Sequence, residues 1–255
     1  MARRAPVDDR PTRIVTIPRA LFLQRYWSYE AGQHVTILGK TGSGKTYLGF
    51  QLLNASISKE LPGVVLVMKP KDSTVELWQR RMQLRRVEHW PPPIIRRKLD
   101  KPRGYVLWPK LGDFDRDDLV LRTEFDRCFR ESYTQAARKN GEPRAIFVDE
   151  VVGVSKELRL EVSLKRLWMR GRSLGIGLWS ATQRPFDAPL LAYQAPEHLF
   201  IAAEPDARSR QRLGEIGGFD SDLIEHIVNP ASLVLGRNQF LYLGREDHVM
   251  AIVER

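Results

Sequence analysis

The 255-residue chain contains a single cysteine, Cys128, so no disulfide can form within it. A chain of this kind suits a reducing compartment, and the apolar periodicity around Cys128 predicts a packing role for its thiol. No apolar run approaches the length of a membrane-spanning helix, and the N-terminus, M-A-R-R-A-P-V-D-D-R-P, is too polar for a signal segment. These absences exclude a disulfide scaffold, and we expect a cytoplasmic chain without a transmembrane segment.

Acidic residues are outnumbered by basic ones, 31 to 41, which gives a net charge of +10. A basic surface attracts polyanions, and nucleic acid is the leading candidate. Much of the excess lies in one basic segment, residues 79–103, which is interrupted by W-P-P-P. We give equal weight to a polyanion-facing insertion and to a solvated helix face for this segment.

Strand and helix patterns alternate along the chain, which predicts an α/β sheet. The expected strands lie at 34–38, 64–68, 105–108, 145–148, 176–181 and 198–203, and the expected helices at 46–57, 121–139, 157–170, 206–216 and 221–228. The run V-V-L-V-M is typical of a strand buried on both faces of a parallel sheet. We expect a basic tail over residues 1–20 and one domain over 21–255, with a basic insertion at about 72–104 and C-terminal strands at about 232–253.

Residues 39–46 read G-K-T-G-S-G-K-T, between a predicted strand and a predicted helix. This is the phosphate-loop pattern, in which glycines let backbone N–H groups surround phosphate oxygens at a helix N-terminus. Lys45 would neutralise the β- and γ-phosphates of ATP, and the Thr46 hydroxyl would bind Mg²⁺. An ordinary glycine-rich turn is the minor alternative. The predicted nucleotide-binding residues are Gly39, Lys40, Thr41, Gly42, Ser43, Gly44, Lys45 and Thr46.

The sequence A-I-F-V-D-E at 145–150 predicts a buried strand that ends in two acids. Asp149 is placed to hold Mg²⁺, through a water, and Glu150 to polarise a water for attack on the γ-phosphate. If no phosphate loop were nearby, the alternative interpretation would be that the two acids only cap a strand at a solvated loop. Next to a phosphate loop, the pair favours hydrolysis over transfer to a substrate hydroxyl.

A third group of polar residues surrounds the predicted strand at 176–181. Gln183 follows this strand after Thr182, where it could sense the γ-phosphate. Arg170 and Arg172 precede it, in a glycine-flanked turn that could present a guanidinium to a neighbouring subunit. The residues are equally consistent with a second interpretation, in which both arginines only solvate a helix C-terminus.

The combination of G-K-T-G-S-G-K-T, F-V-D-E and G-R-S-L-G-I followed by A-T-Q-R-P resembles the FtsK–HerA family of DNA-pumping ATPases, over about residues 33–204. The resemblance implies a RecA-like fold with a mostly parallel sheet and helices on both faces. In that fold the sensor strand lies between the phosphate-loop strand and the acidic strand. It further implies a ring, hexameric or pentameric, that threads DNA through its centre. By analogy Gln183 is the sensor, Arg172 the first choice for the trans finger and Arg170 the second.

The chain departs from the family pattern in several places. The second predicted strand ends in M-K-P-K-D, where relatives often carry an acid before P-K, and Lys69 takes that place without an assigned role. We find no membrane segment, winged-helix extension or added N-terminal barrel. A core of this size is similar to viral genome-packaging ATPases, which implies double-stranded DNA as cargo, a portal or capsid protein as partner, and a place in the host cytoplasm or at the packaging vertex.

Other classes of phosphate-loop protein fit less well. A small GTPase needs N-K-x-D or T-K-x-D, and neither occurs. The sequences D-E-V-V and S-A-T imitate helicase motifs, but a two-lobed helicase needs a second RecA-like lobe that 255 residues do not hold. The remaining alternatives are a conjugation or export motor ATPase, and an ATP-binding nucleic-acid switch with little turnover.

Overall fold

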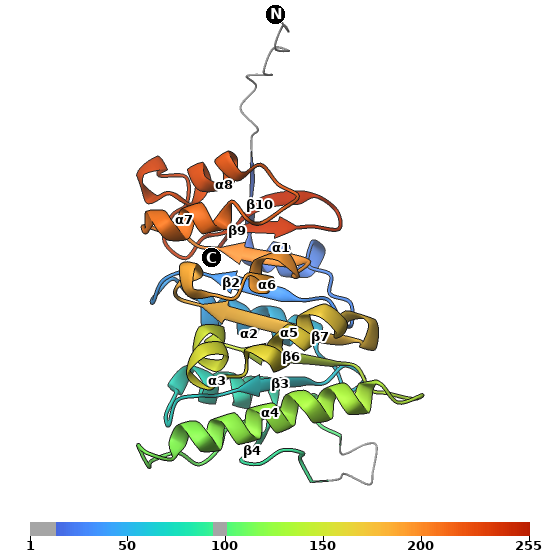
Figure 1. Ribbon diagram of the computed structural model, residues 1–255. Coiled ribbons are helices and arrows are strands. Elements are labelled where there is room, and N and C mark those ends of the chain that lie inside the picture. The colour runs from blue at the N-terminus through green and yellow to red at the C-terminus, as the bar shows by residue number, and fades with distance from the viewer. Residues whose placement is uncertain (1–13, 94–100) are drawn as a thin grey trace, which may run out of the picture.

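The computed structural model describes residues 14–93 and 101–255, so the predictions made for 1–13 and for the part of the basic segment at 94–100 lie outside the described residues. Within the described ranges, ten strands form one sheet in the order β1-β10-β9-β8-β2-β7-β6-β3-β5-β4 (Figure 1). The strands are β1 (Val15–Pro18), β2 (Val35–Leu38), β3 (Gly63–Leu66), β4 (Arg85–Val87), β5 (Gly104–Leu107), β6 (Arg144–Val148), β7 (Ile176–Thr182), β8 (His198–Ile201), β9 (Phe240–Gly244) and β10 (Val249–Glu254).

Strands β8, β2, β7, β6 and β3 form the parallel centre of the sheet. Among the described strands, only β9 runs antiparallel to its neighbours. The strand that precedes Gln183, β7, lies between the phosphate-loop strand β2 and the acidic strand β6, as expected. Because parallel strands end at one edge, the segments that follow β2, β6, β7 and β3 meet there.

Helices cover both faces of the sheet (Figure 1). One face carries α1 (Arg19–Arg25), α2 (Lys45–Ser56) and α3 (Ser73–Met82), and the other carries α4 (Asp117–Ala136), α5 (Glu161–Arg170), α6 (Leu191–Gln194), α7 (Ala207–Leu213) and α8 (Ser221–Val228). Alternate residues of a strand point to opposite faces of the sheet, so they belong to two separate hydrophobic cores. In β6, Phe147 packs toward α2, whereas Ile146 and Val148 pack toward α4 and α5.

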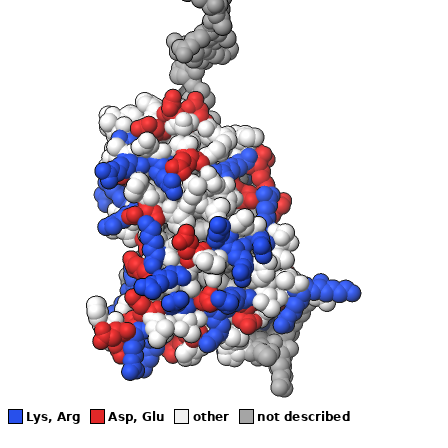
Figure 2. Space-filling view, in the orientation of Figure 1, with Lys and Arg blue, Asp and Glu red and all other residues white. Residues whose placement is uncertain are grey.

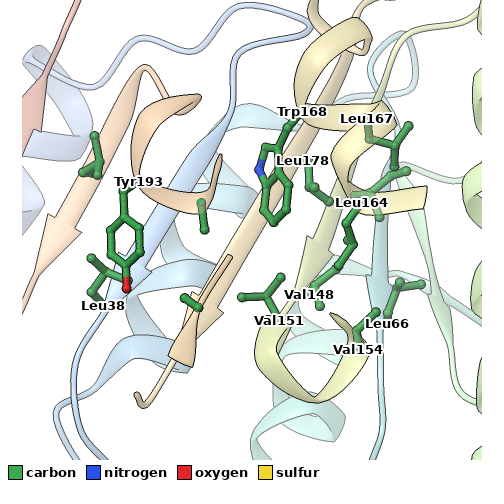
Figure 3. Packing of buried hydrophobic residues seen from close by; sticks show 14 of the residues in the cluster. Leu38, Leu66, Val148, Val151, Val154, Leu164, Leu167, Trp168, Leu178 and Tyr193 are labelled. Atoms are coloured by element: carbon green, nitrogen blue, oxygen red, sulfur yellow. The ribbon is translucent and has the colours of Figure 1, made fainter. Parts of the chain in front are cut away.

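The second of these helical layers illustrates how the core forms. Figure 3 shows Leu164, Leu167 and Trp168 of α5 over Val148 of β6 and Leu178 of β7. This apolar stripe of α5 is therefore buried. This packing holds β6 and β7 side by side, and with them the polar residues at their ends.

The expected N-terminal boundary is corrected by the structure. A tail was expected over residues 1–20, but Val15–Pro18 form β1, which pairs in parallel with β10, and α1 begins at Arg19. The expected C-terminal strands are confirmed only from Phe240 onward. The stretch before them forms a loop, in which Leu233 has a positive φ of 59° and is 88% exposed.

The expected basic insertion at 72–104 is also corrected, because α3 and β4 belong to the sheet architecture. Several of its basic side chains stabilise that architecture. Arg86 lies over the ring of Trp108 with 4.4 Å between guanidinium carbon and centroid, Lys101 pairs with Glu142, and Arg103 donates to carbonyls at the end of α2. On the face shown in Figure 2, Lys and Arg are interspersed with Asp and Glu rather than gathered into one patch.

In the part of the chain that the structure describes, no helix combines the length and apolar character needed to cross a bilayer. The single cysteine, Cys128, is fully buried in α4, as its apolar periodicity predicts.

Candidate nucleotide site

The phosphate loop connects β2 to α2 and adopts a conformation that needs glycine. Gly42 and Gly44 have φ values of 80° and 90°, in the left-handed region that side chains rarely enter. Gly44 is the N-cap of α2, whose first N–H groups therefore have no side-chain cap and face the loop. A twelve-residue helix that begins this way favours an anion at its N-terminus.

Lys45, the first residue of α2, directs its ammonium back across the loop. Its Nζ donates to the carbonyl oxygen of Lys40 at 3.1 Å. Burial lowers the pKa of the Lys45 ammonium, and the nearby Asp149 and Glu150 carboxylates oppose that effect. The ammonium is thus placed beside the site where an anion would sit.

Thr46 and Asp149 form the part of the site that fits a magnesium ion. The Thr46 hydroxyl donates to both carboxylate oxygens of Asp149, at 3.0 and 3.1 Å. A hydroxyl and a carboxylate are hard oxygen ligands of the kind that Mg²⁺ prefers, next to the place expected for nucleotide phosphates. Within the described residues no cluster of three or more His, Cys, Asp or Glu could hold a metal by itself. Such an ion would therefore depend on phosphate and water oxygens as well.

Glu150 follows Asp149 and is linked to β7 by a hydrogen bond. One of its carboxylate oxygens accepts from the Thr182 hydroxyl at 3.3 Å. Burial raises the pKa of both the Asp149 and the Glu150 carboxyl. Two adjacent carboxylates with raised pKa values form a site that gains from a cation.

Gln183 completes the arrangement from the end of β7. Its Oε1 accepts from the hydroxyl of Thr41, in the phosphate loop, at 2.5 Å. The structure therefore brings together Lys45, Thr46, Asp149, Glu150 and Gln183 from three neighbouring strands of the sheet.

Arg170 and Arg172 lie elsewhere. They precede β7, whose seven residues span roughly 20 Å before Thr182 is reached. Arg172 pairs with Glu197 at 2.8 Å and also with Glu246. Arg170 is exposed at the end of α5, and its guanidinium has no ion pair among the described residues.

A second wall of the site was missed by sequence reasoning. A cavity alongside the phosphate loop is lined by residues 40–43 on one side and by the loop 235–239 on the other. The side-chain oxygen of Asn238 lies near Gly44, where an added Cβ would be 3.3 Å away. Arg19, which is 5% exposed, fixes this loop by donating to the Asn238 carbonyl at 2.8 Å and to Gln51 of α2 at 3.2 Å. The contact between Arg19 and Asn238 joins residues 219 positions apart, so local patterns do not reveal it.

No protein-family model matches the sequence, and no curated protein matches it either. Among solved structures, the genome packaging NTPase B204 from Sulfolobus turreted icosahedral virus 2, in complex with AMP, is 13% identical over 87% of this chain and 96% of that chain, with a TM-score of 0.58. B204 has also been solved with AMPPCP and with ATP-gammaS. VirB4 of Thermoanaerobacter pseudethanolicus is 10% identical over 87% of this chain and 89% of that chain, with a TM-score of 0.63. At these identities the likeness shows the fold alone: the chain has the RecA-like fold of phosphate-loop ATPases, as the FtsK–HerA resemblance implied.

Proposed function

We propose that the chain is an ATP-driven DNA translocase of the FtsK–HerA type. In this proposal it hydrolyses ATP at the subunit interfaces of a homo-oligomeric ring, hexameric or pentameric, and packages viral genomic DNA into a capsid. One observation supports it most: an ammonium, a hydroxyl, two carboxylates and an amide converge at the ends of β2, β6 and β7. We assign this function to a single ATPase domain that includes β1 and continues to the end of the chain.

The residues take the following roles in hydrolysis. The phosphate loop, Gly39 to Thr46, binds the triphosphate, and Lys45 balances the charge of the β- and γ-phosphates. Thr46 and Asp149 would hold Mg²⁺, which would supply charge neutralisation to the phosphates. Glu150 accepts a proton from the attacking water, and Gln183 orients that water or senses the γ-phosphate.

The positions of the two arginines support a shared site. A guanidinium at the start of β7 lies roughly 20 Å along the strand from its own phosphate loop, which exceeds the reach of an arginine side chain. It would act on the site of a neighbouring subunit. Arg172 is held by two carboxylates, whereas Arg170 is exposed and unpaired among the described residues, so we propose both as candidates for the finger.

DNA is the proposed cargo. The net charge of +10 favours a polyanion, and B204 is described as a DNA-packaging ATPase. Contacts to the DNA backbone would grip double-stranded cargo without reading its sequence. A portal or capsid protein would then be the partner, and the packaging vertex or the host cytoplasm the place of action.

A conjugation or export motor is the second candidate, because the FtsK–HerA family that the sequence resembles includes conjugation motors. An ATP-binding nucleic-acid switch with little turnover is the third. The switch differs from both motors in one respect: its ATP turnover would not respond to DNA.

The deciding experiment is ATP hydrolysis with and without duplex DNA, on protein whose assembly state is measured by native mass spectrometry. We expect a ring whose turnover rises with DNA, an effect that salt weakens as phosphate contacts are lost. Lys45→Ala should abolish nucleotide binding. Glu150→Gln should bind ATP but hydrolyse it at least about a hundredfold more slowly. Near-normal turnover in Glu150→Gln would remove that residue from its role, and DNA-independent turnover would favour the switch.

A further inference from the structure

The segment that follows β3 runs beside the acidic pair. In the parallel ladder Leu66 pairs with Val148, so Lys69 and Glu150 both lie just beyond the ends of their strands. The Lys69 backbone is fixed there, because the indole Nε1 of the buried Trp108 donates to the Lys69 carbonyl at 2.8 Å. Lys69 therefore starts from a rigid position at the edge where the site residues meet.

The Lys69 side chain has a weak partner. Its Nζ lies 3.4 Å from one carboxylate oxygen of Asp72, and the lysine side chain is 62% exposed. The other Asp72 oxygen accepts from the backbone N–H groups of Thr74 and Val75 and so caps α3. Asp72 is thus held by the helix, whereas an exposed ion pair of this length restrains the ammonium little.

The ammonium also faces the candidate catalytic residues. Lys69, Asp149, Glu150 and Gln183 line one cavity between the ends of β3, β6 and β7. The positive charge of Lys69 lowers the pKa of the Asp149 carboxyl, against the larger effect of burial, and it also lowers the pKa of the Lys45 ammonium. Lys69 is therefore an electrostatic neighbour of both residues.

We propose that Lys69 is a second phosphate-binding lysine, which moves from Asp72 to the γ-phosphate when ATP occupies the site. This inference rests on the proposed ATPase function. Lys45 alone neutralises only part of the charge of a triphosphate, and the carboxylates on this side of the cavity repel the γ-phosphate. An ammonium at the cavity mouth offsets that repulsion for ATP and does nothing for ADP, which lacks the group.

The test compares nucleotide affinity and turnover in matched variants. Lys69→Met removes the charge at similar length, Lys69→Arg keeps it, and Lys71→Met is the control at an exposed lysine two residues further on. Asp72→Asn removes the partner's charge but keeps an oxygen that can cap α3. For each variant the dissociation constants of ADP and of AMPPCP are measured by calorimetry, together with kcat and Tm.

We expect Lys69→Met to weaken AMPPCP binding about tenfold while ADP binding changes less than about twofold, and to lower kcat at least about tenfold. Lys69→Arg and Lys71→Met should stay near the wild type, and Asp72→Asn should bind AMPPCP at least as well. Equal losses for ADP and AMPPCP, or a loss shared by Lys71→Met, would overturn the proposal. So would a drop in Tm common to Lys69→Met and Asp72→Asn without any nucleotide effect, because the pair would then serve only the fold.

The two proposals fail in different ways. A wild-type chain that binds nucleotide but does not hydrolyse it contradicts the ATPase function, and the ratio of AMPPCP to ADP affinity still decides the role of Lys69. A chain that binds neither nucleotide contradicts both.

Discussion

Asp149 carries a charge whose burial costs folding free energy. Burial raises the pKa of its carboxyl. The Thr46 hydroxyl, Lys69 and Lys45 each lower that pKa by a smaller amount, whereas the negative charge of Asp72 raises it further. A raised folded-state pKa means that the fold binds the proton more tightly than the unfolded chain does. Above that pKa the ionised carboxylate therefore destabilises the fold, and a bound cation would remove the cost.

We accordingly predict that Asp149→Asn raises the Tm of the nucleotide-free protein at pH 8 in the presence of EDTA. The asparagine oxygen can still accept from Thr46, while the buried charge is gone. The gain should be a few degrees, since about 1 kcal/mol moves Tm by about 2–4 °C at this chain length. It should shrink as the pH falls toward the ordinary aspartate value of 3.8, because the wild-type carboxyl then takes up its proton. A variant less stable than the wild type at pH 8 would show that the charge contacts outweigh burial.

At the scale of elements, the approach of α2 to the sheet depends on a glycine. A Cβ at Gly49 would lie 2.7 Å from the ring of Phe147 in β6 and 3.2 Å from the Cδ1 of Ile37 in β2. Helix propensity favours alanine over glycine by about 1 kcal/mol. Inserting a methyl group into a packed core costs about 1–3 kcal/mol. The cost of the clash should therefore exceed the gain in helix propensity.

We predict that Gly49→Ala lowers the free energy of unfolding by about 1–2 kcal/mol, measured by urea denaturation. The control is the same change in a Phe147→Leu background, which removes the ring edge that the methyl group meets. There Gly49→Ala should be neutral or stabilising, and the difference between the two backgrounds measures the contact. An equal loss in both backgrounds would mean that the clash with Phe147 is not the cause.

How far the elements could be predicted depends on the range of the interactions that form them. The loop at 39–46, the strand before Asp149 and the strand before Gln183 follow from local patterns, and the structure places their polar ends together. Strand β1 was missed because its partner, β10, is the last strand of the chain and a four-residue edge strand has little pattern of its own. The contact of Arg19 with Asn238 was missed for the same reason. The prediction of a basic insertion was wrong because the arginines of this segment carry charge and also pack on aromatic rings, as Arg86 does on Trp108.

At the scale of the whole molecule, the sheet has two chemically different edges. The edge where β2, β6 and β7 end carries the phosphate loop, the acids and Gln183, and the opposite edge carries Arg170 and Arg172. If the site at one edge takes a guanidinium from a neighbour, as proposed, the basic groups at the opposite edge are placed to supply it when copies of the chain assemble head to tail. A head-to-tail contact of this kind closes into a ring when its rotation divides a full turn.

This arrangement predicts complementation between two inactive variants. Arg172→Ala keeps its own Lys45 and Glu150 but offers no finger to its neighbour, whereas Glu150→Gln keeps the finger but lacks the base. In a random equal mixture about one interface in four joins an intact pocket to an intact finger. ATP turnover of the mixture should recover to about that fraction, while ATP binding by each variant alone stays normal.

The same mixture made with Arg170→Ala identifies which arginine acts. If Arg170 is the finger, Arg170→Ala alone loses turnover and recovers on mixing, whereas Arg172→Ala keeps its activity and loses only the ion pairs with Glu197 and Glu246. Arg170 is exposed and unpaired among the described residues, so its loss should leave Tm unchanged, which separates a catalytic defect from a folding defect. If both arginine variants retain wild-type turnover, or if neither mixture recovers any, then neither Arg170 nor Arg172 enters a neighbouring site.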